Sequence, residues 1–438
     1  MMKNLRNFAL LSAVALSAAA CDGILDVSDP TRVEEEDLAK PVGIELLRVE
    51  AVTQLYDAVS QAALHTGLVT DEFFYVPSSY GMQTGTLYTE TVLDQRLLRG
   101  MQAENLAKAV YERWNAARIA ASHAINWHER YASEAQRPIL GQLLAIKGHA
   151  TLALGEQVCS GFPLHDVAFD RPVYTGPLTT TQVFEKAVEI LEAAVEAAGD
   201  HAEYANFAKV SLGRALLALG RFDEAAKAVE DVPTSYVFNG EYGSGTTAKS
   251  NRLRVSSFSS TGAARGVSDR EGGNGIDFVS ANDPRLQLTR LGVNHTGHEI
   301  FTPAKYQQVD SPITIASGIE ARLIEAEAAL HDNDPRWLTI LNDLRATQVS
   351  PAMAPLDDPG TADARVDLLF RERAFWLFGT AHRLGDLRRL VDLYGRAPET
   401  VFPTGDYIIG GKYDEHTSLP FPLTGEDWAG TGVTGCTN

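Results

Sequence analysis

The chain has 438 residues, of which 45% are hydrophobic, so it has enough apolar material for one large domain or two to three smaller ones. Its formal net charge is −19 at pH 7, and no run of lysines and arginines occurs. Because nucleic-acid binding requires basic side chains that neutralise phosphates, composition excludes a nucleic-acid-binding surface.

Residues 1–20 predict an export signal. Lys3 and Arg6 precede a short apolar segment that begins at Phe8, and small residues follow it. A basic start, an apolar middle of this length and small residues at the end are typical of a secretory signal peptide. The segment is shorter than the ~20 apolar residues of a transmembrane helix. We therefore expect residues 1–20 to be absent from the mature protein.

The sequence Leu16-Ser-Ala-Ala-Ala-Cys21 resembles a bacterial lipobox. In that motif the small residues fit the lipoprotein signal peptidase and the cysteine receives the lipid. Cys21 would become the first mature residue and hold the protein at a membrane through acyl chains such as palmitate, each buried methylene contributing about 0.8 kcal/mol. The alternative is an ordinary signal peptide in which this cysteine has no such role.

Cys159 and Cys436 are the two other cysteines. An even number of remaining cysteines in an exported, oxidising compartment favours a disulfide. Such a bond would tie the last residues of the chain to the early helical region. Two unpaired thiols are the alternative.

Most of the chain shows the periodicity of amphipathic helices. Thr179 to Gln182, for example, forms a T-x-x-Q capping box before an apolar stripe that begins at Phe184. The helical segments are predicted near residues 41–66, 93–131, 135–155, 180–198, 205–232, 317–331, 336–348, 363–379 and 382–394. Paired in order, they give about four helical hairpins.

The segment from Phe207 to Pro233 predicts two helices joined by a tight turn at Gly220. Small residues, including Gly213 and Ala225, allow the two helices to approach closely. The order of leucines, glycines, Phe222 and the closing proline resembles the tetratricopeptide pattern, although its early tryptophan is absent. A single hairpin of this kind cannot bury its apolar face, so stacked neighbours are expected.

Two regions lack helical periodicity. Residues 234–316 are rich in Gly, Ser, Asn and Thr, and residues 395–438 are rich in Gly and Pro. The first is too long for a simple loop, so we expect an irregular, strand-poor insertion resting on the helices, where variable function tends to reside. We expect the second to wrap a helical scaffold made of residues 41–233 and 317–394.

Motifs typical of catalysis or metal binding are incomplete. His128-Glu129 and His298-Glu299 do not continue into H-E-x-x-H, and neither a G-x-S-x-G motif nor a Cys/His metal spacing occurs. Carboxylates are too numerous for a glycosidase pair to be rejected by counting, but most belong to an acidic surface. The sequence predicts no catalytic residue, no metal and no cofactor.

A turn-rich stretch from Phe73 to Tyr88 holds several aromatic residues beside amides and hydroxyls. Sugar recognition uses aromatic faces that stack on the apolar faces of the ring while polar groups bind its edges. Tyr75, Tyr80 and Tyr88 are therefore candidate ligand-binding residues. The alternative for each of them is packing against the core of the scaffold.

Several stretches, in this order, resemble the SusD/RagB family of outer-membrane lipoproteins. Each is weak alone, while their joint order is specific and covers essentially the whole mature chain. They are Cys21 to Pro30 with Leu25-Asp26-Val27, Thr70 to Phe73, Val110 to Ile119 with Asn126, Lys305-Tyr306 followed by Glu320 to Ala328, Glu372-Arg373, His382 to Arg389, and Leu419 to Pro422.

Three departures from the family pattern indicate a divergent branch. Ser317 stands where the family usually has an arginine, Thr380-Ala381 replaces Glu-Gly, and Gly385 replaces an aromatic residue. The motif carboxylates and arginines also have a structural interpretation. Glu320 and Glu327 share one face of a helix, and Asp386 with the arginine pair Arg388-Arg389 is expected to tie helix ends together by ion pairs.

The resemblance implies a mostly α, tetratricopeptide-like scaffold with a loop-rich insertion, as one SusD-like domain over residues 21–438. It implies a non-enzymatic protein, lipid-anchored in the outer membrane and facing the cell exterior. Such a protein captures nutrient oligomers, glycans most often and peptides sometimes, and partners a SusC-like TonB-dependent transporter. The alternatives are a tetratricopeptide-type scaffold lipoprotein that assembles envelope proteins without a small ligand, and a surface hydrolase.

Overall fold

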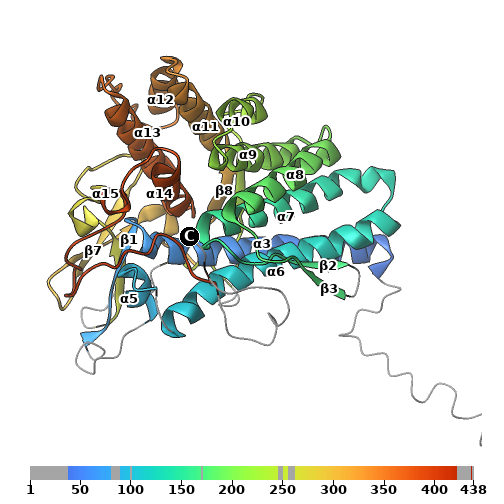
Figure 1. Ribbon diagram of the computed structural model, residues 1–438, viewed down its shortest axis with the longest axis horizontal. Helices are drawn as coiled ribbons and strands as arrows, with labels where there is room; N and C mark the ends of the chain where they lie inside the picture. Colours follow the sequence, from blue (N-terminus) through green and yellow to red (C-terminus); the bar gives the residue numbers. More distant parts are fainter. Residues whose placement is uncertain are drawn as a thin grey trace, which may run out of the picture.

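The computed structural model describes residues 38–79, 89–98, 101–168, 171–244, 250–254, 262–421 and 436. This part of the chain is mostly helical (Figure 1). The α-helices are α3 (Pro41–Val69), α5 (Thr89–Asp94), α6 (Met101–Tyr131), α7 (Arg137–Gln157), α8 (Thr180–Ala198), α9 (Ala202–Ala218), α10 (Phe222–Val229), α11 (Gly318–His331), α12 (Arg336–Thr347), α13 (Ala362–Trp376), α14 (Arg383–Asp392) and α15 (Pro398–Val401).

Consecutive helices pack side by side and form a stacked scaffold. Helix α3 packs on α6, α6 on α7, α7 on α8, and α8 on α9, while α10 and α11 continue the stack to α12. Figure 1 shows these helices as successive layers, with the strands β1 and β7 and helices α5 and α15 gathered at the opposite end. The predicted tetratricopeptide-like helical scaffold is confirmed. One predicted helix, 93–131, is divided into α5 and α6.

The hairpin of α9 and α10 follows the sequence pattern closely. Gly220 lies between the helices with a φ of +71°, a conformation that glycine adopts without strain. A Cβ atom added at Gly213 would come within 2.6 Å of Val229, so the missing side chain lets α9 and α10 touch. Gly213 and Gly220 therefore have the roles in this hairpin that the sequence pattern predicted.

The strands are short and pair only in twos. They are β1 (Phe73–Val76), β2 (His165–Ala168), β3 (Arg171–Tyr174), β4 (Val237–Gly240), β5 (Ala264–Val267), β6 (Leu288–Val293), β7 (Glu299–Pro303) and β8 (Ile313–Ser317). The antiparallel pairs are β1 with β5, β2 with β3, β4 with β8 and β6 with β7. In the described part of residues 234–316, strands β4 to β8 are four to six residues long and are separated by irregular backbone. Three of these strands pair over long sequence separations, β4 with β8 and β5 with β1, which no local period reveals.

Buried ion pairs join α11, α13 and α14. Arg373 donates to both carboxylate oxygens of Asp386 at 2.9 and 2.8 Å. Arg389 donates to both oxygens of Glu327 at 2.8 and 2.9 Å and to Asp386 at 3.1 Å. The expected tie between helices through Asp386 and Arg389 is therefore confirmed. Arg388 acts differently, because its guanidinium donates to the carbonyls of Gly155, Glu156 and Val158 at the end of α7.

A second buried group connects α7, α9 and α11 through Arg214. This arginine donates to Glu156 at 2.7 Å and contacts His382, which lies 3.0 Å from Glu320. A Cβ at Gly385 would lie 3.0–3.2 Å from the side chain of Glu156. Glycine at this position therefore leaves room for the carboxylate that pairs with Arg214.

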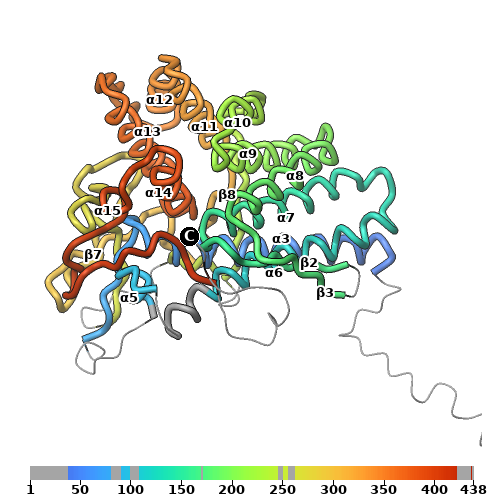
Figure 2. Tube along the Cα trace, in the orientation of Figure 1, coloured from blue at the N-terminus to red at the C-terminus, as the bar shows by residue number. Residues whose placement is uncertain are grey.

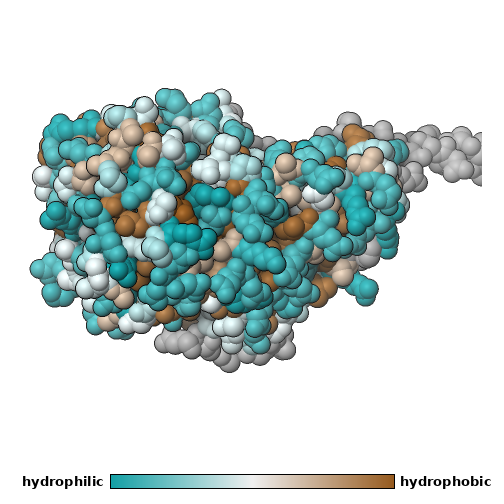
Figure 3. Space-filling model, turned by 90° about the horizontal axis from the view of Figure 1, so that it is seen from above, coloured by the Kyte–Doolittle hydropathy of each residue, from teal (hydrophilic) through white to brown (hydrophobic). Residues whose placement is uncertain are grey.

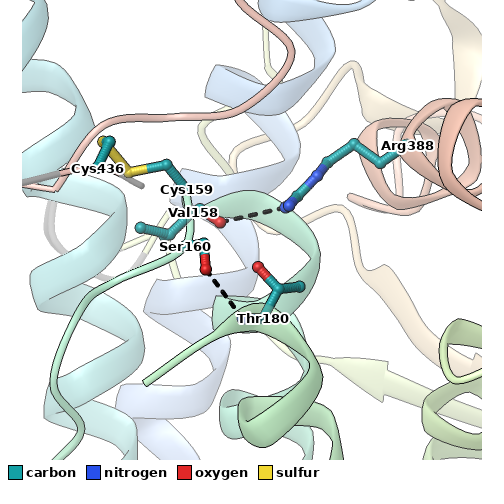
Figure 4. Close-up of a disulfide and its surroundings, with 6 residues drawn as sticks. All are labelled: Val158, Cys159, Ser160, Thr180, Arg388 and Cys436. Carbon is teal, nitrogen blue, oxygen red and sulfur yellow. Dashed lines mark hydrogen bonds between the residues drawn. A yellow bond between two sulfur atoms is a disulfide. The ribbon is translucent and has the colours of Figure 1, made fainter. Parts of the chain in front are cut away.

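The C-terminal tail runs from the loop-rich end to the middle of the molecule, near the end of α7 (Figure 2). Leu419 forms a parallel bridge with Val158, and Arg96 donates to the carbonyls of His416 and Pro403 at 2.9 and 2.6 Å. Cys159 and Cys436 form a disulfide with a Cα–Cα distance of 5.5 Å and a sequence separation of 277 residues (Figure 4). The tail therefore links the scaffold to the loop-rich end.

The scaffold surface is hydrophilic over most of the face seen in Figure 3, where apolar residues form small groups among polar ones. Within the residues that the structure describes, every helix is too short or too polar to cross a membrane.

Candidate functional site

A cavity of about 430 Å³ lies at the loop-rich end. This volume falls within the range of small-ligand sites. We call it the loop-side pocket. Its lining residues come from β1, β5, the short 3-10 helix η3 (Glu271–Gly273), the β6–β7 hairpin and the tail: Phe74, Val267, Ser268, Asp269, Arg270, Glu271, Gly272, Gly273, Val279, His298, Glu299, Phe301, Asp406, Ile408 and Tyr413.

Long-range pairing brings these segments together. Phe74 of β1 lies opposite Gly266 of β5, and a Cβ at Gly266 would fall 2.6 Å from the Phe74 ring. Gly272 has a φ of +61°, and a Cβ there would lie 2.3 Å from the backbone nitrogen of Thr404. The tail thus packs directly on η3, and glycine is required at both contacts. These contacts place Asp406, Ile408 and Tyr413 at the pocket.

The floor of the pocket rests on a pair of buried carboxyl groups, Asp94 and Glu271. Burial raises the pKa of Asp94 to about 7, and burial together with the neighbouring Asp94 raises the pKa of Glu271 well above its usual value. The Tyr407 hydroxyl donates to Asp94 at 2.6 Å, and the Tyr413 hydroxyl donates to Glu271 at 2.8 Å. Two acidic groups in contact cannot both ionise cheaply, so this pair holds a proton near neutral pH.

The hydrogen bonds of this pair connect several segments. The backbone N–H of Tyr75 in β1 donates to Asp94 at 2.6 Å, and Ser268 after β5 donates to Glu271. Tyr407 also donates to the carbonyl of Tyr75 at 2.9 Å. The pocket floor therefore depends on one polar cluster shared by α5, β1, η3 and the tail.

The pocket wall combines apolar and charged side chains. Val279, Phe301 and Ile408 are half-buried. Asp269 accepts hydrogen bonds from the backbone N–H groups of Val279 and Ser280 at 3.0 and 2.9 Å. An arrangement of this kind suits a ligand with apolar faces and hydroxyl edges. Among the described residues, His, Cys, Asp and Glu form no cluster that could hold a metal ion.

A smaller cavity of about 260 Å³ lies on the scaffold beside α3. Tyr56 and Tyr242 line it together with Arg48 and Asp57. The Tyr242 hydroxyl donates to the Tyr56 carbonyl at 2.9 Å, which fixes the loop against the helix. This cavity is smaller than the loop-side pocket and draws on fewer segments of the chain.

The residues proposed from the sequence have different positions. Cys21, Tyr80 and Tyr88 lie outside the described residues. Tyr75 is only 5% exposed and belongs to the main apolar core, the role that the alternative interpretation gave it. Cys159 and Cys436 lie at the tail contact, away from the residues that line the pocket.

Sequence reasoning did not single out the individual pocket residues. Phe301, Ile408 and Tyr413 lie in the two regions without helical periodicity, which was the available signal. Their juxtaposition depends on the tail crossing the insertion, as Figure 2 shows, and single-sequence patterns do not report that contact.

Neither a family model nor a curated protein sequence matches the chain. Solved structures do. A SusD superfamily protein from Parabacteroides distasonis ATCC 8503 has a TM-score of 0.65 at 12% identity, over 93% of this chain and 100% of that one. A SusD-like protein from Bacteroides fragilis NCTC 9343 has a TM-score of 0.64 at 12% identity, over 93% and 98%.

Surface glycan-binding protein A from Bacteroides thetaiotaomicron, solved in complex with laminarihexaose, also matches. Its TM-score is 0.64 at 12% identity, over 90% of this chain and 99% of that one. Together these structures define the architecture as a tetratricopeptide-like helical scaffold with a loop-rich end. The chain has the SusD-like fold, as the resemblance in its sequence predicted.

Proposed function

We propose that this chain is a lipid-anchored binding protein of the bacterial outer membrane that captures oligosaccharides in the loop-side pocket. The observation that carries the proposal is the location of this pocket at the loop-rich end of a SusD-like fold. A neighbour with the same fold was solved in complex with laminarihexaose, a glucose oligomer. The pocket offers half-buried apolar side chains for sugar faces and carboxylates for sugar hydroxyls.

In this proposal the captured oligomer passes to a SusC-like TonB-dependent transporter, and the protein itself is not an enzyme. Cys21 carries the lipid and keeps the protein at the outer surface. Glycans are the first expectation for the ligand and peptides the second. Tyr80 and Tyr88 remain candidate contacts on the stretch that follows β1.

Isothermal titration calorimetry of the mature chain against a panel of neutral oligosaccharides, laminarihexaose included, tests the capture step. We expect saturable binding of at least one member without release of shorter sugars. If the panel and a matching set of peptides all fail to bind, a scaffold lipoprotein without a small ligand replaces the proposal. Sugar release that disappears when one carboxylate is changed would instead indicate a hydrolase.

Two further experiments test the anchor and the partner. Cells fed labelled palmitate should label the wild-type protein but not Cys21→Ala, while Cys159→Ala should remain labelled. Pull-down from detergent-solubilised membranes should recover a large β-barrel protein with the wild type. Recovery of other envelope proteins and no barrel would contradict the transporter partnership.

A further inference from the structure

The smaller cavity beside α3, of about 260 Å³, is separate from the loop-side pocket, and we call it the tyrosine cavity. The two cavities share no lining residue. Because a helix rises about 1.5 Å per residue, roughly 20 Å of α3 separates Tyr56 from the end of the helix at Val69. The residues that line the tyrosine cavity are Arg48, Val49, Val52, Thr53, Tyr56, Asp57, Glu241, Tyr242 and Gly243.

Long-range strand pairing builds the second wall of this cavity. Glu241 and Tyr242 directly follow β4, whose Gly240 lies opposite Ile313 of β8, and both strands pack on α3. A Cβ at Gly240 would lie 2.9 Å from the Tyr242 hydroxyl and 3.4 Å from the Tyr56 ring. Glycine therefore lets the two tyrosine rings approach, with centroids 6.3 Å apart and planes tilted by 55°.

The α3 side of the cavity is an apolar wall that remains open to water. Val49 is 45% exposed, and Val52 and Tyr56 are half-buried. A ligand with an apolar face would remove this surface from water, which is favourable. A sugar ring has such a face, and an aromatic ring is a suitable surface for it.

Two polar groups of the lining are available to a ligand. Within the described part of the chain, the Tyr56 hydroxyl and the Glu241 carboxylate have neither a hydrogen-bond nor an ion-pair partner. Burial raises the pKa of Tyr56, so its hydroxyl stays protonated and can donate. The exposed Glu241 can accept from sugar hydroxyls, and such charge-assisted bonds are stronger than neutral ones.

The other charged residues of the lining already have partners. Arg48 donates to both carboxylate oxygens of Glu45 at 2.7 and 2.6 Å. Asp57 pairs with Arg113 at 2.6 Å and with Arg252 at 3.0 Å. Counted with these partners and with the unpaired carboxylate described above, the charged lining residues have no net charge. The cavity therefore suits a neutral ligand.

Resting on the proposed function of saccharide capture, we infer that the tyrosine cavity is a second saccharide site, which holds one sugar unit of a neutral glycan. The apolar face of that unit covers Val49, Val52 and the Tyr56 ring, and its hydroxyls bond to the Tyr56 hydroxyl and to Glu241. The volume lies below the range of about 300–1,000 Å³ that is typical of pockets for larger ligands, so the cavity holds one unit and not an oligomer.

NMR of the mature chain with labelled valine methyl groups observes both cavities in one titration. Val49 and Val52 report the tyrosine cavity, and Val279 reports the loop-side pocket. With laminarihexaose and the other neutral oligosaccharides as probes, we expect the Val49 and Val52 signals to shift and to saturate. They should do so equally in Val279→Ala with Ile408→Ala. Loss of the cavity shifts in that variant would show that they are transmitted from the loop-side pocket, which would overturn the inference.

Conservative variants identify the polar contacts. Tyr56→Phe with Glu241→Gln keeps the shape of the cavity and should weaken binding there roughly ten-fold or more, while the Val279 signal titrates as in the wild type. The matched control, Tyr131→Phe with Glu185→Gln, changes an exposed tyrosine of α6 and an exposed glutamate of α8 and should leave both titrations unchanged.

The remaining outcomes separate this inference from the proposed function. Shifts at Val279 without shifts at Val49 and Val52, or a cavity titration that the Tyr56 and Glu241 variant leaves unchanged, overturn the second site alone. Cavity shifts with peptides but not with saccharides overturn the ligand class. No shift at any of the three valines, with any oligosaccharide, overturns the second site and the proposed function together.

Discussion

Buried carboxylates occur both in the helical scaffold and beneath the loop-side pocket, but their partners differ. In the scaffold, burial alone would raise the pKa of Asp386, and Arg373 and Arg389 outweigh it, so the pKa lies below its usual value. Asp71, between Arg383 and backbone donors, behaves in the same way. Beneath the pocket no arginine pairs with Asp94 or Glu271 among the hydrogen bonds described, and both pKa values are raised.

Because of this difference, the two groups of carboxyls contribute to folding stability with opposite pH dependence. Asp386 and Asp71 have lowered pKa values, so their contribution to stability is present above the pKa of the unfolded chain and is lost on acidification. Asp94 and Glu271 have raised pKa values, so their contribution is present below the unfolded pKa and is lost as pH rises through the folded pKa, which is about 7 for Asp94. The ion pairs of Asp386 and Asp71 therefore weaken at low pH, whereas the carboxyl pair beneath the pocket weakens as pH rises.

The largest expected effect comes from breaking the scaffold network. Arg373→Met removes a side chain that is 1% exposed and leaves Asp386 with one fewer cation in the core. We expect the free energy of unfolding to fall by about 3–5 kcal/mol, because an uncompensated charge remains buried. Urea unfolding followed by circular dichroism measures it.

The chain contains a matched control for that variant. Arg365 makes the same two-pronged contact with Asp358, at 2.7 Å for both bonds, but on the surface. Arg365→Met should leave the unfolding midpoint nearly unchanged, because surface ion pairs contribute little. Equal losses in the two variants would mean that burial does not distinguish the scaffold network.

Removing the disulfide tests how much the link between the tail and the scaffold contributes to stability. Reduction, or Cys159→Ser with Cys436→Ser, opens a loop of 277 residues. We expect a loss of about 2–4 kcal/mol, since closure of a long loop restricts the unfolded chain. Thermal unfolding with and without reductant measures the loss. The double variant should not respond to reductant, and a wild type that also does not respond would contradict the role given to this bond.

A substitution at Glu271 tests the pH dependence of stability that we assign to the buried carboxyl pair. In the wild type, ionisation of the second carboxyl beneath the pocket costs stability as pH rises from about 5 to 8. Glu271→Gln removes that charge and keeps an oxygen that can accept from Tyr413. Between pH 5 and pH 8, the free energy of unfolding should fall by about 1–2 kcal/mol less in the variant than in the wild type. One pKa unit corresponds to about 1.4 kcal/mol.

An exposed carboxylate on the same face serves as the control for this pH series. Glu299→Gln, at a side chain 54% exposed, should follow the wild-type profile. A Glu271→Gln profile that also coincides with the wild type would show that the buried pair does not retain a proton. Guanidinium unfolding at several pH values gives all three profiles.

The smallest predicted effect on stability is that of replacing a glycine by alanine, at Gly220 in a scaffold turn and, for comparison, at Gly243 in a loop. Gly220→Ala should cost about 1–2 kcal/mol, because a left-handed φ of +71° crowds a Cβ against the following carbonyl. Gly243 has no positive φ of this kind, and a Cβ there would meet open space, so Gly243→Ala should not destabilise the protein. Differential scanning calorimetry resolves the pair, and a lower Tm for Gly243→Ala than for Gly220→Ala would contradict this assignment.

The scaffold was predictable because its signals are local. Gly220, the capping box at Thr179 and the periodic apolar residues each act within a few residues of their position. The acidic and basic residues of the SusD/RagB-like stretches indicated the order of the helices along the chain. Among these residues, Asp386 and Arg389 form the ion pairs expected of them. The replacement at Gly385, by contrast, is explained by a residue distant in sequence, because Glu156 of α7 occupies the space beside it.

The pocket was predictable only as a region. Its members pair over long sequence separations, as Phe74 does with Gly266, and the tail supplies Ile408 and Tyr413. No periodicity in one sequence reports such contacts. Tyr75 illustrates the limit, because an aromatic residue in a turn-rich stretch fits an exposed sugar contact and a buried strand equally well, and the structure places it in the core.

The most direct test of the central claim is the affinity of a bound oligosaccharide for two double variants, measured by calorimetry. Val279→Ala with Ile408→Ala removes apolar side chains from the loop-side pocket, whereas Val173→Ala with Tyr174→Ala removes exposed ones from β3 on the scaffold. A site at the pocket predicts a loss of roughly ten-fold or more for the first variant and wild-type affinity for the second. Wild-type affinity in the pocket variant, with a loss in the β3 variant, would place the ligand on the scaffold and contradict the assignment.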